Sequence, residues 1–570
     1  MKKLGRCHSL ILISQSLWIT TTYALADQPA ASQTIKGLGT ATFPTTTHSA
    51  EAQTAFIRGL LLLHVFEYDD AAKAFQSAEK IDPTFAMAYW GEAMTHNHPV
   101  WNELDTPAGQ AALNKFAPTP EARAALVADP RQKGFLAAVE ILYTNKGTKP
   151  ERDALYAKAM QKLAAAHPKD DEAQLFYCLA LLGRSEGIRD VPTYLEAAAI
   201  AKAAYDRNPN HPGAAHYWIH GMDDPEHASG ALVAARSLSK IAPDAGHAQH
   251  MCSHIFMALG MWQSVVDANL QGMQVVDDQR RAMGRPILDC GHYAIWLQYA
   301  YDQQGRHQEG YKQLAACGRT AKDAFAWMDA HSSQPFASSA ARKTLNERSN
   351  RSLVTMRGTA VIESSQWNGP AASMVIDTAL LGSDVGWDAF TTGYAAAQRG
   401  DLPTAQASLR KLTEVTQTTH ADRKAEKETA TYLDILSDEL GGLLAGKTAD
   451  MAAAIKAVQR ASATYDSMAF DFGPPPILKP PQELLGELLL KDAKPKQACE
   501  AFEASLKRAP NRSLSLLGLA RAQKAAGDKV AAAATYKLLL ANWKTADPGN
   551  PELAEARHYL TTEKKLAASN

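Results

Sequence analysis

Apolar residues along this chain recur at spacings of three and four positions, the period of an amphipathic helix. Each such segment covers roughly 12 to 16 residues, and short turns containing Gly, Asp, Asn or Pro separate one segment from the next. Sustained alternation of β-branched residues, which marks strands, does not occur in the sequence. The pattern predicts an all-α protein made of helices joined by tight turns.

One stretch shows how these helices are expected to pair. AQTAFIRGLLLLHVFEYDDAAKAFQSAEKIDP places small, aromatic and helix-ending residues where a tetratricopeptide hairpin has them: Gly59, Ala71, Phe75, Ala78 and Pro83. Similar units recur around Gly393, Gly400 and Ala405, and around Ala498, Phe502 and Pro510. The chain therefore resembles the tetratricopeptide-repeat family over most of its length, in particular large exported bacterial members. The resemblance implies an α-α superhelix, a solenoid of helical hairpins with a concave binding groove.

The amino terminus has the features of an export signal. Lys2, Lys3 and Arg6 precede an apolar stretch over residues 10–19, and Ala24-Leu25-Ala26 supplies a cleavage site. We expect residues 1–26 to be a cleaved signal peptide and the mature protein to be periplasmic, in a bacterium, or secreted. No later run of about 18 apolar residues occurs, so we expect no transmembrane segment.

Three segments interrupt the repeats and suggest how the mature chain is organised. Residues 101–135 and 331–352 are expected to be loops or insertions. The proline-rich DFGPPPILKPP, with a turn near 473–481, is expected to pack back on the solenoid rather than to serve as a ligand for a partner. We predict an N-terminal array over 27–345 that carries a histidine-rich groove, and a C-terminal array over 346–570.

The charge and cysteine content restrict the classes of partner and the disulfide bonding that we expect. The 59 basic and 60 acidic residues nearly cancel, which argues against nucleic acid or a membrane surface as a partner. Five cysteines remain after the signal peptide, at irregular spacing. A disulfide framework is not expected, although a single bridge would be compatible with the sequence.

The histidines carry the most specific signal. His216 and His220 recur 34 residues later as His250 and His254, and the proline ahead of each pair is shifted by the same interval. This interval is the tetratricopeptide period, so the pairs should occupy equivalent places on neighbouring helices. The i, i+4 spacing puts both imidazoles of a pair on one helix face about 6 Å apart. Four imidazoles converging in this way suit Zn or Cu.

The family's groove positions, carried over to three consecutive hairpins, gather still more histidines. Six of fifteen such positions are histidine, whereas random placement of 18 histidines among 570 residues would give about 0.5. The predicted ligands are His216, His220, His247, His250, His254 and His292. Further candidate groove residues are His64, His98, Asp223, Asp224, Met94, Met257, Trp90 and Tyr299.

These further residues have alternative interpretations. Asp223 and Asp224 would either orient imidazole N–H groups or end their helix. The methionines would suit Cu(I) or simply pack, and the two aromatic residues would suit an aromatic substrate or a peptide side chain. His64 and His98 would join the cluster only if the superhelix curls far enough.

Two functional hypotheses remain open at this point. In the first, the groove binds a transition metal, Cu or Zn, for carriage or as a metal-dependent oxidoreductase acting on a small molecule. In the second, the chain is a metal-free scaffold that binds a peptide or an envelope protein, and its histidines are hydrogen-bonding contacts. Sequence spacing does not decide whether the protein is catalytic.

Overall fold

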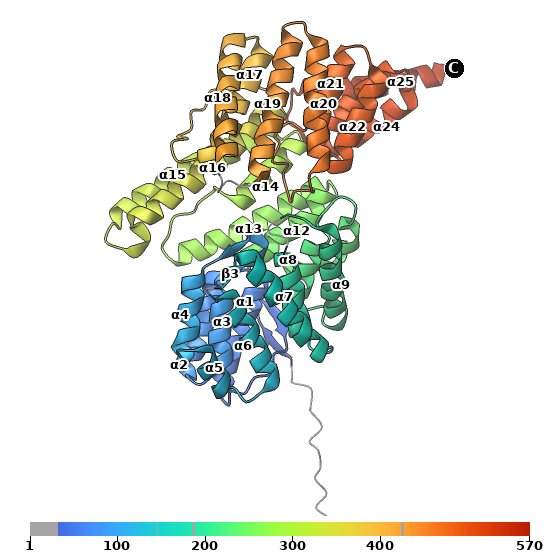
Figure 1. Cartoon of the computed structure of the whole chain (residues 1–570). Coiled ribbons are helices and arrows are strands. Elements are labelled where there is room, and N and C mark those ends of the chain that lie inside the picture. Colours follow the sequence, from blue (N-terminus) through green and yellow to red (C-terminus); the bar gives the residue numbers. More distant parts are fainter. Residues whose placement is uncertain (1–31, 145, 185–187, 423–426, 570) are drawn as a thin grey trace, which may run out of the picture.

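The computed structural model describes residues 32–144, 146–184, 188–422 and 427–569. Helices make up nearly all of this part of the chain and stack as antiparallel hairpins, which confirms the all-α, tetratricopeptide-like class (Figure 1). The predicted signal peptide, residues 1–26, lies outside the described residues. Among the residues described, no helix combines the length and apolar character that crossing a bilayer requires.

The first half of the chain, blue to green in Figure 1, curls so that its first and tenth helices pack together. Small residues allow the close stacking: a Cβ at Gly59 or Gly91 would come within 2.8 or 2.4 Å of the Phe75 ring. The helices of this half are α1 (Ala50–His64), α2 (Tyr68–Ile81), α3 (Ala86–Met94), α4 (Thr106–Phe116), α5 (Pro120–Leu126), α6 (Pro130–Leu142), α7 (Lys149–Ala166), α8 (Asp171–Gly183), α9 (Val191–Arg207), α10 (Pro212–Gly221), α11 (Leu232–Ile241), α12 (Gly246–Ala258), α13 (Trp262–Ala282) and α14 (His292–Gln303), with 3-10 turns η1 (Pro99–Trp101) and η2 (Ala228–Ala231).

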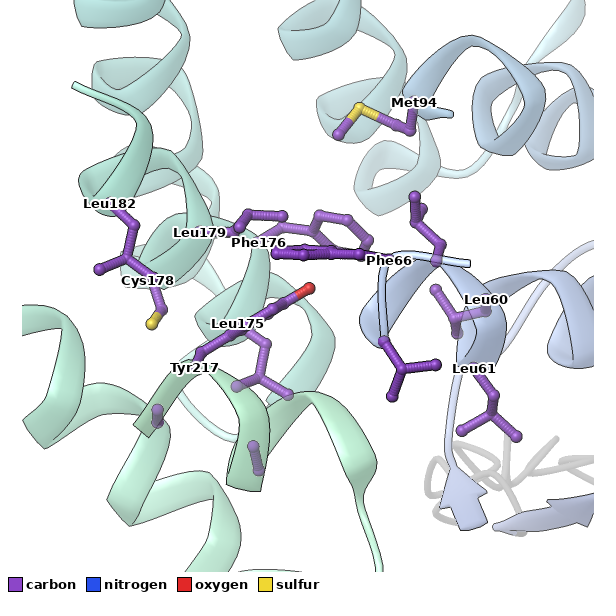
Figure 2. Close-up of a cluster of buried hydrophobic side chains, with 14 of the residues drawn as sticks. Leu60, Leu61, Phe66, Met94, Leu175, Phe176, Cys178, Leu179, Leu182 and Tyr217 are labelled. Atoms are coloured by element: carbon purple, nitrogen blue, oxygen red, sulfur yellow. The ribbon is translucent and has the colours of Figure 1, made fainter. Parts of the chain in front are cut away.

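The core of this half joins helices that are distant in sequence. Leu60 and Leu61 on α1, Phe66 in the following turn, and Phe176 on α8 converge in one buried cluster with Tyr217 of α10 (Figure 2). This packing fixes where α10 lies relative to α1 and α8, and α10 carries two of the predicted ligands.

The second half, yellow to red in Figure 1, continues the stack with longer helices. Its boundaries do not follow the predicted division, because residues 345 and 346 both lie inside one helix, α16. Its elements are α15 (His307–Ala330), η3 (Pro335–Ala337), α16 (Ser339–Ser364), η4 (Gly382–Asp384), α17 (Val385–Arg399), α18 (Leu402–Ala421), α19 (Lys427–Lys447), α20 (Met451–Ser467), α21 (Pro481–Lys491), α22 (Pro495–Arg508), α23 (Ser513–Ala525), α24 (Lys529–Asn542), η5 (Trp543–Thr545) and α25 (Pro551–Ser569).

The β-structure of the described residues consists of two short antiparallel hairpins. β1 (Gln33–Ile35) pairs with β2 (Gly39–Ala41), and β3 (Asn97–His98) pairs with β4 (Glu103–Leu104). The backbone N–H of Thr40 also donates to the carbonyl of Asn210 at 2.9 Å, just before α10. The first hairpin is therefore tied to the helix that carries His216.

Residues 101–135 and 331–352 were expected to be loops or insertions, and the loop alternative is wrong for most of these residues. Helices α4 and α5 and the start of α6 fill the first segment, and α16 begins within the second. The prolines begin these helices instead of interrupting them: Asp105, Thr119 and Asp129 are N-caps, each followed by a proline in the first turn.

The proline-rich segment packs back on the helices, as predicted. Ile477 and Leu478 are buried, and the indole N–H of Trp387 donates to the carbonyl of Pro476 at 2.8 Å. One disulfide, Cys290–Cys317, joins the loop before α14 to α15. The segment and the disulfide both hold α14 against the rest of the molecule.

Candidate metal centre

The six predicted histidines come together from three helices. His216 and His220 lie on α10, His247, His250 and His254 on α12, and His292 at the start of α14. They form two groups, in each of which one ring nitrogen per residue lies within 4.8 Å of the others. We call His216, His220 and His247 the first trio, and His250, His254 and His292 the second trio.

The first trio contains buried nitrogen atoms without partners. The His216 Nδ1–H donates to the carbonyl of His64 at 2.7 Å, which leaves the lone pair on Nε2. Within the part of the chain that the structure describes, the Nε2 atoms of His216, His220 and His247 are buried and have no hydrogen-bond partner. An unsatisfied buried polar atom costs about 1–3 kcal/mol, so three together need an explanation.

In the second trio, two lone pairs point at each other. The His250 Nδ1–H donates to the Asn269 Oδ1 at 2.7 Å, and the Asn269 amide is oriented by its own donation to the Val265 carbonyl. The His254 Nδ1–H donates to the Asp223 carboxylate at 2.5 Å. Both Nε2 atoms then carry lone pairs, and they lie only 3.2 Å apart. With these tautomers, a cation between the two atoms, either a proton on one ring or a metal ion, would remove the repulsion between the lone pairs.

The 3.2 Å separation fits a shared metal ion. Two imidazole nitrogens bound to one zinc at 2.0–2.1 Å with a tetrahedral angle lie about 3.3 Å apart. Asp223 and Asn269 stand where carboxylates and amides commonly hold the second nitrogen of a metal-binding imidazole and fix its tautomer. Both pairs on i, i+4 positions also meet as predicted, with ring centroids 4.7 Å apart for His216 and His220 and 5.1 Å for His250 and His254.

Burial keeps several of these rings neutral. It lowers the pKa of His216 to about 3 and lowers the pKa values of His220, His247 and His250 well below 6.5. These four rings are therefore uncharged at pH 7, the form in which imidazole coordinates a metal.

The backbone around the trios is held by specific contacts. The Glu67 carboxylate accepts the backbone N–H of His247 at 3.0 Å and so caps the start of α12. Helices α12 and α13 approach closely at Gly272, where a Cβ would lie 3.4 Å from the backbone nitrogen of His250. These contacts hold α12, which supplies ligands to both trios.

Aromatic rings that the sequence analysis missed surround the trios. The Phe66 ring lies 4.4 Å from that of His216, and Trp101 lies 5.7 Å from His247. Trp296 lies 4.4 Å from His254, and Tyr293 stacks on His250 at 4.5 Å. Tyr293 and Trp296 lie on the same helix as His292. The i, i+4 spacing of His292 and Trp296 could therefore have predicted that Trp296 lies beside a candidate ligand. The position of Phe66 could not be predicted from the sequence, because Phe66 lies in a turn with φ +58°, a conformation that is rare for Phe.

His64 belongs to a different cluster. Its Nε2 pairs with the Glu172 carboxylate at 2.7 Å and its Nδ1 with the Tyr217 hydroxyl at 2.9 Å. His211 also donates to Glu172, at 2.9 Å, and accepts the backbone N–H of Ala214. Although burial raises the Glu172 pKa, attraction to His64 and His211 and their hydrogen bonds lower it below its usual range, so the carboxylate stays ionised.

The remaining candidates lie apart from the trios. Asp224 pairs with Arg189 at 2.5 Å and with His227, so only Asp223 of the two aspartates orients a trio ring. His98 stacks on Tyr68 at 4.0 Å. Met94 contacts the Tyr156 hydroxyl in the core of the first half. These placements give them no direct contact to a metal held by either trio.

Trp90 does not line a groove. It is 1 % exposed and packs against Phe43, Phe135 of α6 and Phe176 of α8, and these segments cover the side of α3 that the repeat register left open. Met257 and Tyr299 do line a cavity, of about 60 Å³, but the chain's own segment around Gly473 and Pro475 forms its other wall. The concave side is therefore partly filled by the proline-rich segment.

A second cavity reaches the trios themselves. It contains about 1030 Å³ of open space and has His247 of the first trio and His292 of the second in its wall. Trp101, Met273, Leu288 and Tyr293 supply aromatic and apolar surface. A small molecule entering this cavity would meet both trios.

No protein-family model and no curated protein sequence matches the chain. Among solved structures, it is similar to chains of the APC/C hetero-tetramer Cut9-Hcn1, the human IFIT1 dimer with m7Gppp-AAAA and yeast Tom70. Sequence identities are 12, 12 and 10 %, with TM-scores of 0.33, 0.30 and 0.27. The similarities cover 90, 87 and 90 % of this chain and 76, 91 and 96 % of the others. Scores this low carry no argument about function.

Proposed function

We propose that the two histidine trios bind a transition metal, Cu or Zn. The observation that supports this most strongly is the set of buried Nε2 atoms: three lack a partner among the described residues, and two others face each other at 3.2 Å. Metal ions held by the trios would satisfy all five, whereas a proton can satisfy only the facing pair.

The donor set limits the choice of metal. Every predicted ligand is an imidazole, which suits Zn and Cu, and Cu binds more tightly when both are present. Cys252 lies on the same helix as the second trio, but its thiol contacts the backbone carbonyl of Ala248. With copper the site would have one-electron chemistry available, and a metal-dependent oxidoreductase is the enzymatic form of this proposal.

We propose that this protein works in an oxidising compartment, the bacterial periplasm or the secreted space. The basic and apolar amino terminus is typical of an export signal, and the Cys290–Cys317 bridge is of the kind that persists outside the cytosol. Export would also expose the protein to the metals it is proposed to bind. Retention of residues 1–26 on the protein from cell fractions would contradict this assignment.

A ligand-induced stability change tests metal binding. Metal-free protein without a histidine tag should gain about 2.7 kcal/mol of unfolding free energy when free Zn or Cu exceeds its Kd 100-fold. The His292→Gln variant, changed at an exposed position, should fold normally and gain less unfolding free energy from the metal than the wild type does. His227→Gln, a histidine outside both trios, should gain as much as the wild type. Equal responses of all three proteins would mean that the trios are not the site.

The second candidate function is a scaffold that binds a peptide, a small molecule or an envelope protein without metal. The stacked hairpins and the exposed-mouthed cavity beside Met257, Trp262 and Tyr299 favour it. Recovery of one defined partner that is insensitive to chelator and lost on Tyr299→Ala would support this function. Failure to recover any partner from the tag-free protein under mild conditions would count against it.

A further inference from the structure

The six histidines divide into two sets of three. One ring nitrogen from each member converges within 4.8 Å inside each trio, and the two trios use no residue in common. Zinc and copper take about four ligands, so six imidazoles exceed what one ion uses. Three protein ligands on an ion also leave a coordination position open, as in catalytic zinc sites.

The two trios contact each other through two pairs of histidine rings. The ring centroids of His220 and His254 are 5.9 Å apart, and those of His247 and His250 are 6.1 Å apart. Separations inside the second trio reach 6.3 Å, so the gap between the trios is no wider than a trio itself. Two ions held by adjacent trios would correspond to the arrangement of two-metal sites, in which a pair of neighbouring ions acts on one ligand.

We infer that each trio holds one metal ion and that the two ions form a pair bridged by a small ligand that enters from the cavity at Trp101. This inference rests on the proposed metal binding. It specifies how many ions are bound and which face of the pair is open.

Charge and access both point to an anionic bridge. Two divalent ions repel each other, and the six imidazoles that would hold them supply no negative charge to offset that repulsion. Among the described residues, Asp223 supplies the carboxylate that contacts a trio ring. This carboxylate already accepts a hydrogen bond from His254. A hydroxide, or another small anion such as azide, placed between the ions would reduce this repulsion. His247 and His292, one from each trio, both line the cavity that would admit it.

Copper loading distinguishes a bridged pair from a single ion. Metal-free, tag-free protein is given excess Cu(II), desalted, and analysed by elemental mass spectrometry and electron paramagnetic resonance. We expect two coppers per chain and a resonance far weaker than two independent Cu(II) ions would give, because a bridging ligand couples their spins. Added azide should change the visible absorption of this species.

Variants assign each ion to its trio. His292→Gln and His220→Gln should each lower the copper content toward one per chain and restore a full one-copper resonance, while His227→Gln keeps two coppers and the weak signal. One copper per chain in the wild type would overturn the pair and leave metal binding intact. Two coppers with full resonance would overturn the bridge. Absence of bound copper would overturn the metal proposal itself, so failure of the pair and failure of the metal site are distinguishable.

Discussion

The cluster of His64, Glu172 and His211 lies near the two histidine trios and differs from both in how its ring nitrogens are hydrogen-bonded. In the His64, Glu172 and His211 cluster, hydrogen bonds engage every ring nitrogen: Glu172 accepts from both rings, and Tyr217 and Ala214 engage the rest. In the trios, lone pairs of the same kind of ring are buried without partners or face one another. The presence of buried imidazoles does not separate these clusters, since all three contain them. Hydrogen-bond satisfaction does, and it suggests that the first is structural and the others bind a ligand.

The largest expected effect concerns the satisfied cluster. Glu172→Ala removes the acceptor of two buried imidazole N–H groups, which should lower the unfolding free energy by roughly 2–6 kcal/mol. Metal content per folded chain should stay the same, because neither trio loses a ligand. Urea unfolding and elemental analysis of the same preparation give both quantities. A stable variant without metal would reverse the roles assigned to the clusters.

The two neighbouring aspartates offer a matched pair. Asp223→Asn weakens the acceptor that orients His254 and should reduce metal affinity about tenfold, the lower end of such effects. Asp224→Asn breaks the buried pair with Arg189 and should reduce stability while leaving affinity unchanged. Competition with a coloured chelator measures the affinity. Equal affinity losses for both variants would show that the effect is not specific to the trio.

Lowering the pH should destabilise the metal-free protein, because a trio histidine is held neutral in the folded state. Burial lowers the folded pKa of His216 to about 3, so between pH 6.5 and pH 3 the unfolded chain binds a proton that the folded chain does not. Stability is therefore lost as pH falls through this window, by about 1.4 kcal/mol per pH unit for one such histidine. His216→Gln should show a shallower slope by about that amount between pH 6 and pH 4.5, measured by urea unfolding. An unchanged slope would mean that His216 is not held neutral.

The smallest expected effect is at the mouth of the cavity. Trp101 is 46 % exposed, so Trp101→Ala should change the unfolding free energy by about 1 kcal/mol or less. It should nevertheless speed the removal of metal by a chelator, because the indole lies beside His247. The number of bound ions should not change. Slower or equal removal would indicate that metal leaves by another route.

Sequence alone predicted the helical repeats and the meeting of all six histidines, because the 34-residue interval fixes equivalent positions on α10 and α12. It did not predict the division into trios. His247 starts α12 and joins the two α10 histidines, whereas His250 and His254 pair with His292 of α14. That choice depends on how the helices pack, which repeat spacing does not specify.

Other errors have a similar physical origin. The repeat register assigned Trp90 to the groove, but the N-terminal segment, α6 and α8 cover it. His64 reaches α10 only because the first half of the chain curls, and its carbonyl then orients His216. Both outcomes depend on tertiary contacts between segments far apart in sequence, and neither leaves a mark in local periodicity.

The most direct test of the central claim is the metal content of tag-free mature protein, measured by elemental mass spectrometry beside a His216→Ala, His250→Ala double variant. Each change removes one ligand from one trio. We expect Cu or Zn in near-stoichiometric amount in the wild type and little in the folded double variant. Absence of metal from both proteins after metal is supplied, or equal metal in both, would contradict the assignment of the trios as a metal site.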